Sequence, residues 1–318
     1  MWPLRSAMAS FAAVLLLLLA PLVSSLSMDY YAISCPNVES IVRTTMRGLF
    51  VRDPTSPAAM LRLIFHDCSV FGCDASILLD SGSDGTAELE APANLGVRRL
   101  DWIDNVKGRL EAACPQTVSC ADIIALAARE AVAQNGGPNI DIPLGRLDGF
   151  SASSSAAESS LPSATISVSD MFAFFGAMGM SVPESVAILG AHTLGIAHCT
   201  NFVDRLYPVR DPNMGLLFAN TLKARCPRQF PSNAFAALDT SNFRFDNSYF
   251  RNILNGRGLL MIDSEIGLDP RTGPIVENFA NSPGAFFDAF ASAFVKLSSN
   301  NVLSGNQGEV RVNCHFPN

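Results

Sequence analysis

The chain has 318 residues and carries 22 lysines and arginines against 29 aspartates and glutamates, so its formal net charge is −7 at pH 7. An acidic chain is a poor general partner for nucleic acid, and we exclude that class of function. The length is sufficient for a large core, arranged as one big domain or as two small lobes.

The N-terminal residues have the pattern of a secretory signal. Arg5 precedes the apolar run Phe11–Ala20, and small residues follow up to Ser27. The run is short for a membrane crossing, which favours a signal peptide over a membrane anchor or a helix of the domain. We predict a signal peptide at 1–27 and a mature protein at 28–318 that does not enter a membrane and is secreted to the cell wall, with the vacuole as the alternative destination. Removing the signal takes away one positive charge and brings the net charge to −8.

All cysteines follow the signal, and their number is even. An even number in an exported chain predicts disulfides, here four. Only two pairs are close in sequence and neither is a CxxC, so a zinc site is disfavoured. Spacing alone does not choose among the possible pairings. The eight cysteines are Cys35, Cys68, Cys73, Cys114, Cys120, Cys199, Cys226 and Cys314.

In chain order, apolar residues recur at helical spacing in six segments. These are Ala58–Asp67, Arg98–Ala113, Cys120–Gln134, Val168–Met178, Pro183–Gly190 and Pro283–Ser298. The stretch Ser151–Ser169 is rich in serine and alanine and is broken by Pro162, which predicts a surface connection. Long alternating patterns typical of strands are missing. The predicted fold class is mostly α.

The first candidate for chemistry lies in the first of these helices. Arg62 and His66 are four residues apart, so their side chains share one helical face, and Phe65 precedes the histidine. An arginine and a histidine together can take a proton and stabilise a developing anion. Taken alone, the pair is more typical of a structural histidine beside a surface arginine.

The residues after this pair are rich in oxygen side chains. Asp67, Asp74 and Ser76 surround a short loop between Cys68 and Cys73. Carboxylate and hydroxyl oxygens with loop carbonyls suit a hard cation such as Ca²⁺. The spacing is not that of an EF-hand, and a capped surface turn is the alternative.

A second histidine cluster lies further along the chain. His192 stands between Gly190 and Gly195, and a histidine at such a helix end could ligate a metal or haem iron. Asp263 could orient it by accepting a hydrogen bond from the other ring nitrogen. Each signal is weak by itself.

Six motifs together resemble the secretory (class III) plant peroxidases over nearly all of the mature chain. They are Tyr31–Asn37, Leu61–Ser76, Glu111–Asp122, Gly190–Cys199, Phe245–Tyr249 and Gly308–Cys314. The resemblance implies two helical lobes that enclose haem b, with four disulfides and two Ca²⁺ sites. It implies an enzyme that reduces H₂O₂ through high-valent iron and oxidises small phenolic or aromatic donors.

On the distal side of the haem, the resemblance implies roles for Arg62, Phe65 and His66. His66 would take a proton from peroxide and deliver it to the departing oxygen, while Arg62 would stabilise the separating charge. Asn94 matches the residue that hydrogen-bonds His66.

On the proximal side, the resemblance implies that His192 is the axial ligand of the haem iron and that Asp263 accepts its other ring N–H. His198 matches a position that contacts a haem propionate. Pro162 matches the haem-edge segment that meets donors. Pro92 and Asn201 stand where some relatives place aromatic rings.

The resemblance also implies the metal ligands and the cysteine pairs. The distal Ca²⁺ ligands would be Asp67, Val70, Gly72, Asp74 and Ser76, linked through water to Glu88. The proximal Ca²⁺ ligands would be Thr193, Asp239 and Asp246, with groups between Ser241 and Arg244. The disulfides would be Cys35–Cys114, Cys68–Cys73, Cys120–Cys314 and Cys199–Cys226.

Two competing functions remain at this point. A non-catalytic haem- or calcium-binding protein of the cell wall shares the signal and the cysteines. Such a protein has no need to combine Arg62, His66, Asn94, His192 and Asp263. The signal and paired cysteines count against an intracellular peroxidase. We expect a monomer, a solvated His315 in the C-terminal tail, and no N-linked glycan, because no Asn-x-Ser/Thr acceptor follows the signal.

Overall fold

The computed structural model describes residues 26–82, 85–229, 231 and 233–318. Helices dominate these residues. They are α1 (Val38–Arg52), α2 (Ser56–Cys68), α3 (Leu100–Ala113), α4 (Cys120–Ala133), α5 (Ser154–Ser160), α6 (Val168–Ala177), α7 (Val182–Leu189), α8 (Leu216–Arg225), α9 (Ser248–Leu254), α10 (Met261–Leu268), α11 (Gly273–Asn281) and α12 (Pro283–Ser298). One small antiparallel sheet pairs β1 (Ile196–His198) with β2 (Phe235–Ala237), with Ala197 opposite Ala236.

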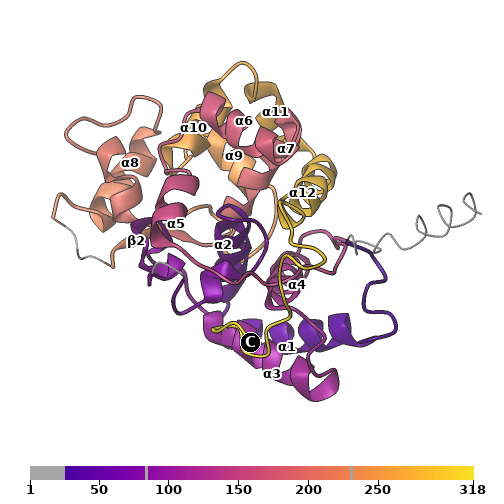
Figure 1. Cartoon of the computed structure of the whole chain (residues 1–318). Helices are drawn as coiled ribbons and strands as arrows, with labels where there is room; N and C mark the ends of the chain where they lie inside the picture. The colour runs from indigo at the N-terminus through magenta and orange to yellow at the C-terminus, as the bar shows by residue number, and fades with distance from the viewer. Residues whose placement is uncertain (1–25, 83–84, 230, 232) are drawn as a thin grey trace, which may run out of the picture.

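The helices form two lobes (Figure 1). In the N-terminal lobe, α4 packs against α1, α2 and α3, and in the C-terminal lobe, α12 packs against α7 and α11. Every residue from Cys120 to Val132 of α4 is buried, so this helix is the core of its lobe. The Ser119 side chain caps its N-terminus by accepting a hydrogen bond from the Asp122 amide at 3.1 Å.

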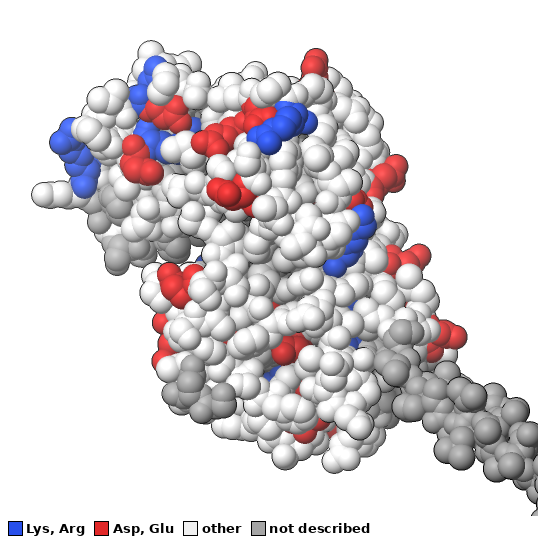
Figure 2. Space-filling model, turned by 45° about the horizontal axis from the view of Figure 1, so that its top comes forward, with Lys and Arg blue, Asp and Glu red and all other residues white. Residues whose placement is uncertain are grey.

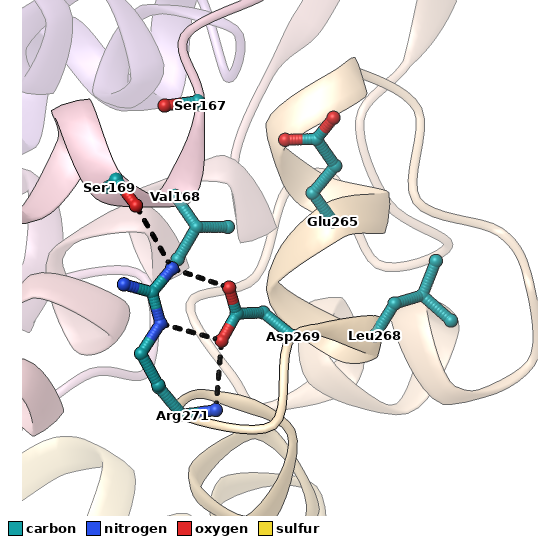
Figure 3. Close-up of a pocket in the computed structure, with 7 residues that line it drawn as sticks. All are labelled: Ser167, Val168, Ser169, Glu265, Leu268, Asp269 and Arg271. Carbon is teal, nitrogen blue, oxygen red and sulfur yellow. Dashed lines mark hydrogen bonds and ion pairs between the residues drawn. The ribbon is translucent and has the colours of Figure 1, made fainter.

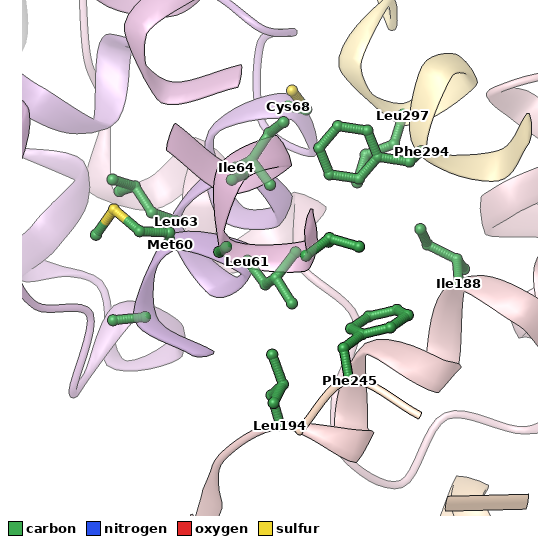
Figure 4. Close-up of a cluster of buried hydrophobic side chains, with 14 of the residues drawn as sticks. Met60, Leu61, Leu63, Ile64, Cys68, Ile188, Leu194, Phe245, Phe294 and Leu297 are labelled. Atoms are coloured by element: carbon green, nitrogen blue, oxygen red, sulfur yellow. The ribbon is translucent and has the colours of Figure 1, made fainter. Parts of the chain in front are cut away.

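The two lobes meet where α2 approaches α12. Figure 4 shows Ile64 of α2 beside Phe294 and Leu297 of α12. Asn300, just after α12, donates from Nδ2 to the carbonyl oxygen of Cys68 at the end of α2, at 2.8 Å. This contact fixes α2 relative to the C-terminal lobe.

The core of the C-terminal lobe is aromatic. The Phe286 ring lies 5.5 Å from Phe245, 4.9 Å from Phe250 and 5.8 Å from Phe290, measured between centroids. A Cβ on Gly190 would stand 2.4 Å from the Phe286 ring, so only glycine lets the backbone at the end of α7 pass this close to the ring. Burying each such ring stabilises the fold by roughly 1.5–3 kcal/mol.

The structure contains four disulfides. They are Cys35–Cys114, Cys68–Cys73, Cys120–Cys314 and Cys199–Cys226, the pairs that the family resemblance implies. Cys120–Cys314 spans 194 residues of sequence and ties the C-terminal tail to the start of α4. In the chain-entropy model, a closure of this length stabilises the fold by about 5 kcal/mol.

The six predicted helices appear as α2, α3, α4, α6, α7 and α12; α12 has the predicted ends, and the ends of the others differ from the prediction by at most two residues. The prediction that Ser151–Ser169 is wholly a connection is wrong, because α5 forms within it. The Ser153 side chain caps α5 by accepting from the Ala156 amide at 3.3 Å.

The predicted signal peptide lies outside the described residues, except for Leu26 and Ser27. Ser27 forms an antiparallel bridge with Leu144. No single helix of the described residues is long and apolar enough to span a membrane; α6 and Val182–Thr193 reach that threshold only as a pair bent by 103°. On the face in Figure 2, acidic and basic side chains are scattered among uncharged ones.

Candidate active site

The distal part of the candidate site is built on α2. One helical turn separates Arg62 from His66, and Arg62 Nε donates to His66 Nε2 at 3.1 Å. Asn94 Oδ1 accepts from His66 Nδ1, and Asn94 Nδ2 donates to the carbonyl oxygen of Glu88 at 2.6 Å. This network assigns the proton of neutral His66 to Nδ1 and leaves Nε2 as a proton acceptor.

Burial and charge keep His66 neutral. Burial, followed by the positive charge of Arg62, lowers the pKa of His66 to about 4, although the hydrogen bond to Asn94 opposes the shift. The side chain of His66 is therefore neutral, and able to accept a proton, at pH values above about 4. A neutral imidazole beside a guanidinium can accept a proton from a weak acid while the guanidinium stabilises the anion that forms.

The proximal part is built at the end of α7. His192 lies in the short 3₁₀ helix Gly190–Thr193, and its Nδ1 is 3.0 Å from Asp263 Oδ1. Asp263 is fully buried and also accepts from Tyr249 Oη at 2.8 Å and from the Leu260 amide at 2.8 Å. With Nδ1 held, Nε2 is the ring nitrogen left to ligate a metal. Tyr249 is a site residue that sequence reasoning missed, although it ends the motif at Phe245–Tyr249.

The donor set fits a haem. A histidine whose second nitrogen is held by a carboxylate is the ligand type expected for haem iron. His198 has a buried Nδ1 without a hydrogen-bond partner in the described structure, which leaves it available to an added polar group. A Cβ on Gly96 would lie 3.3 Å from Arg62 Nη1 and 4.0 Å from His198 Nε2, so these two side chains converge on one place. Phe65, which precedes His66 in α2, packs against Phe174 of α6, with centroids 6.0 Å apart.

A cluster of buried oxygens adjoins the distal residues. Asp67 Oδ1, Ser76 Oγ and both carboxylate oxygens of Glu88 are buried and have no hydrogen-bond partner in the described structure. Burial and the charges of Asp74 and Glu88 raise the pKa of Asp67 well above its usual value, and burial with the charge of Asp74 raises the pKa of Glu88 to about 8. Such orphaned oxygens fit a divalent cation.

No group of three or more histidine, cysteine, aspartate or glutamate side chains in the described ranges forms a metal site by itself. A cation at the distal cluster would therefore need hydroxyl and carbonyl ligands as well. Val70 is half-buried and Gly72 is buried in the same loop. The carbonyl oxygen of Gly72 accepts from the Asp74 amide at 2.9 Å.

A second oxygen cluster lies beside His192. Thr193 Oγ1 donates to Asp239 Oδ2 at 2.8 Å and lies 3.4 Å from the carbonyl oxygen of Arg244. Ser241 Oγ is 3.0 Å from both Asp239 Oδ1 and Asp246 Oδ1. Burial raises the pKa of Asp239 above its usual value, although hydrogen bonds from Ser241 and Thr193 oppose the shift. The structure thus brings all five predicted proximal positions together.

Pro162 lies just beyond α5 and is half-buried. Glu158 of α5 accepts a hydrogen bond from the Ala93 amide at 3.1 Å, which ties this segment to the neighbourhood of Asn94. A separate surface hollow of about 380 Å³ lies between α6 and α10 (Figure 3). There Arg271 donates to Asp269 and Ser169. No predicted catalytic residue lines that hollow.

The expectation of a solvated His315 is wrong. Its Nδ1 is 2.8 Å from Asp80 Oδ1, and its Nε2 is 3.1 Å from Asp104 Oδ2. Partial burial lowers the pKa of His315, but the hydrogen bonds and charges of Asp104 and Asp80 outweigh it and raise the pKa above its ordinary value. His315 therefore joins the tail to the N-terminal lobe.

Comparison with known proteins agrees with this geometry. The model of the peroxidase family matches residues 42–282. Peroxidase 29 of Arabidopsis thaliana is 48% identical over 91% of this chain and 88% of its own length. Peroxidase 28 of Arabidopsis thaliana is 44% identical over 96% of this chain and 98% of its own, and cationic peroxidase SPC4 of Sorghum bicolor is 41% identical over 94% and 83%. The chain therefore belongs to the class III plant branch of the peroxidase family, whose members are haem peroxidases.

Proposed function

We propose that haem b binds between the lobes with His192 as its axial ligand, and that Arg62, His66 and Asn94 act on H₂O₂ at the opposite face. The hydrogen bond from His192 Nδ1 to buried Asp263 supports the proximal assignment most directly. Haem supplies the redox chemistry of the reaction, and the protein supplies its orientation and proton transfers.

His66 is the proton carrier in this proposal. Its Nε2 accepts a proton from the oxygen of peroxide nearer the haem and returns it to the far oxygen, which leaves as water. Arg62 stabilises the negative charge that develops as the O–O bond breaks. Asn94 holds the proton on Nδ1, so Nε2 stays unprotonated and can exchange its hydrogen bond with Arg62 Nε for a proton from peroxide. Two donor molecules then each give one electron and one proton, so that one H₂O₂ becomes two waters.

Small phenols and other aromatic compounds are the proposed donors. They would meet the haem edge near Pro162, because the distal side is already filled by the hydrogen-bonded side chains of Arg62, His66 and Asn94. Phe65 would form an apolar wall of the same pocket, and His198 would bind a haem propionate. The enzyme is proposed to act as a secreted monomer of residues 28–318, made of distal and proximal lobes, after removal of a signal peptide at 1–27.

Two calcium ions complete the proposal. The distal ion would take side-chain oxygens of Asp67, Asp74 and Ser76 and carbonyl oxygens of Val70 and Gly72, with Glu88 linked through water. The orphaned oxygens of the distal cluster support it. The proximal ion would take oxygens of Thr193, Asp239, Ser241, Arg244 and Asp246. Chelation should lower the thermal unfolding midpoint, because an ion that binds only the native state stabilises it. Metal analysis that finds no calcium in native protein would contradict this part.

Two variants test the catalytic assignment. His192→Ala should lose the native Soret band, because the axial nitrogen is gone. His66→Leu should keep the haem but react with peroxide at least ~10²-fold more slowly, the lower range for lost acid–base catalysis. Native haem occupancy and spectrum in His192→Ala, or a stopped-flow rate within a few-fold of wild type in His66→Leu, would overturn the corresponding role. A haem-loaded wild type that does not react with peroxide would favour the non-catalytic alternative.

A further inference from the structure

The C-terminal tail reaches the distal oxygen cluster through one buried arginine. Arg311 is fully buried. Its Nη2 donates to the carbonyl oxygen of Ala75 at 2.7 Å and to that of Asp74 at 3.3 Å, and its Nη1 donates to the carbonyl oxygen of Cys314 at 2.6 Å. The guanidinium therefore binds backbone carbonyls of the tail and of the loop at residues 69–75, here called the distal loop, at the same time.

A buried aspartate anchors this arginine. Asp148 Oδ2 accepts from the Arg311 amide at 2.9 Å and from the Cys120 amide at 3.0 Å, and Asp148 Oδ1 accepts from the Ala121 amide at 2.8 Å. The backbone of Asp148 also pairs with that of Glu309 in both directions, at 2.7 and 3.0 Å. Asp148 thus joins the tail to the start of α4, and Arg311 joins the tail to the distal loop.

The distal loop needs this support because of its backbone conformation. Ala75 has φ +57°, in the left-handed region that a residue with a Cβ disfavours. This turn points the carbonyls of Asp74 and Ala75 toward Arg311 and brings the Ala75 amide to Asp67 Oδ2 at 3.1 Å. Without Arg311, the Ala75 carbonyl would keep only the Leu78 amide as donor, at 3.1 Å, and the Asp74 carbonyl only the Gly149 amide, at 2.8 Å. The left-handed turn would then be held less firmly, and Asp74 and Ser76 would be freer to move away from Asp67.

We propose that Arg311 is a positioning residue for the distal cation site, so that the site is complete only when the C-terminal tail is docked. This inference rests on the distal calcium site of the proposed function. Arg311 would touch the loop backbone and not the ion. Gly149 holds the same loop from another side, since its amide donates to the Asp74 carbonyl at 2.8 Å and a Cβ there would lie 2.4 Å from Asp74 Oδ2.

Charge and positioning make opposite predictions for Arg311→Gln. If the guanidinium acted only as a nearby positive charge, its loss would tighten calcium binding, because like charges repel. If it positions the loop, its loss weakens binding. We expect the distal dissociation constant to rise at least tenfold, while the proximal ion binds as in wild type.

The experiment uses the haem-loaded enzyme. Calcium per protein is counted by metal analysis, and the dissociation constants are obtained by competition with a chromophoric chelator. Asp67→Asn identifies which binding phase belongs to the distal ion. Arg205→Gln is the matched control, because Arg205 is also buried and donates to three carbonyls, those of Gly258, Leu259 and Leu260, at 2.7 Å each.

Unchanged or tighter distal binding in Arg311→Gln, or an equal loss in Arg205→Gln, would overturn the inference. Wild-type enzyme without a distal ion would instead overturn the calcium site itself, so the two failures are distinguishable. If Arg311→Gln does not fold, Arg311→Lys carries the test, because lysine keeps the charge but lacks the two-armed fork. Its distal affinity should then lie below that of wild type, and an unchanged affinity would count against the inference.

Discussion

Replacing Arg62 by glutamine should move the acid limb of the peroxide reaction to higher pH. Arg62 Nε lies 3.1 Å from His66 Nε2, and burial together with the charge of Arg62 lowers the pKa of His66 to about 4. Two unit charges about 4 Å apart interact by about 1 kcal/mol in water and about 4 kcal/mol at an effective dielectric constant of about 20. Because one pKa unit corresponds to about 1.4 kcal/mol, these energies correspond to roughly 0.7 and 3 pKa units. Arg62 is only half-buried, which favours the lower figure, and burial of His66 persists in the variant, so we expect the pKa of His66 to rise by about one unit.

The assay is the second-order rate of the peroxide step, followed by stopped flow as the pH is lowered. This rate reports protonation of the free enzyme, and it is lost as pH falls through the pKa of His66 because only the neutral ring accepts a proton. Arg62→Lys is the matched control. It keeps the positive charge, so its acid limb should stay near that of wild type even though its rate falls. Coincident acid limbs for Arg62→Gln and wild type would refute the reasoning.

Three further outcomes follow from buried or paired groups. Asp122→Ala should lower the free energy of unfolding by about 3–5 kcal/mol, because it leaves the charge of buried Arg146, whose Nη1 donates to Asp122 at 2.7 Å, without its partner. Denaturant unfolding measures this change. Asp141→Ala, at an exposed site, is the control and should change little. His315→Ala should lower the unfolding midpoint most in mildly acidic buffer. The raised pKa of His315 makes its contribution full below the unfolded-state pKa and lost as pH rises through the folded-state pKa, so a difference that grew with pH would contradict the assignment. Intact mass from a eukaryotic secretion host should show no N-linked glycan, and hexose-containing mass released by an N-glycosidase would be the contrary result.

Local spacing explains which parts of the fold the sequence predicts. Arg62 and His66 share a helical face whatever the tertiary structure, and α2 and α4 carry continuous apolar spacing. α1 lies outside the predicted helices although Val42, Met46 and Leu49 follow the same spacing, so that signal is present in the sequence. α8 gives no such signal, because it exposes Leu216 and Leu217 and has no single apolar face.

Contacts between distant residues explain the remainder. Asp263 is 71 residues from His192, and Asn94 is 28 residues from His66. No local spacing relates such residues, so before the structure is known the family resemblance is the main reason to pair them. The partners of His315 are 235 and 211 residues away, and no sequence pattern marks them. Arg311 shows the same limit, because a lone arginine in a tail motif does not indicate which carbonyls it binds.

The position of the tail has a consequence for the order in which the protein can be completed during synthesis. A nascent chain emerges from its N-terminus, and N-terminal units generally begin to fold first. Here the N-terminal lobe depends on Cys314, which bonds to Cys120, and on His315, whose carbonyl accepts from the Asp80 amide at 3.2 Å. Translation must therefore nearly finish before the first lobe can close. A premature stop that removes only the last eight residues, from Arg311 onward, would leave α1 to α4 intact in sequence but without their final covalent and hydrogen-bonded closure.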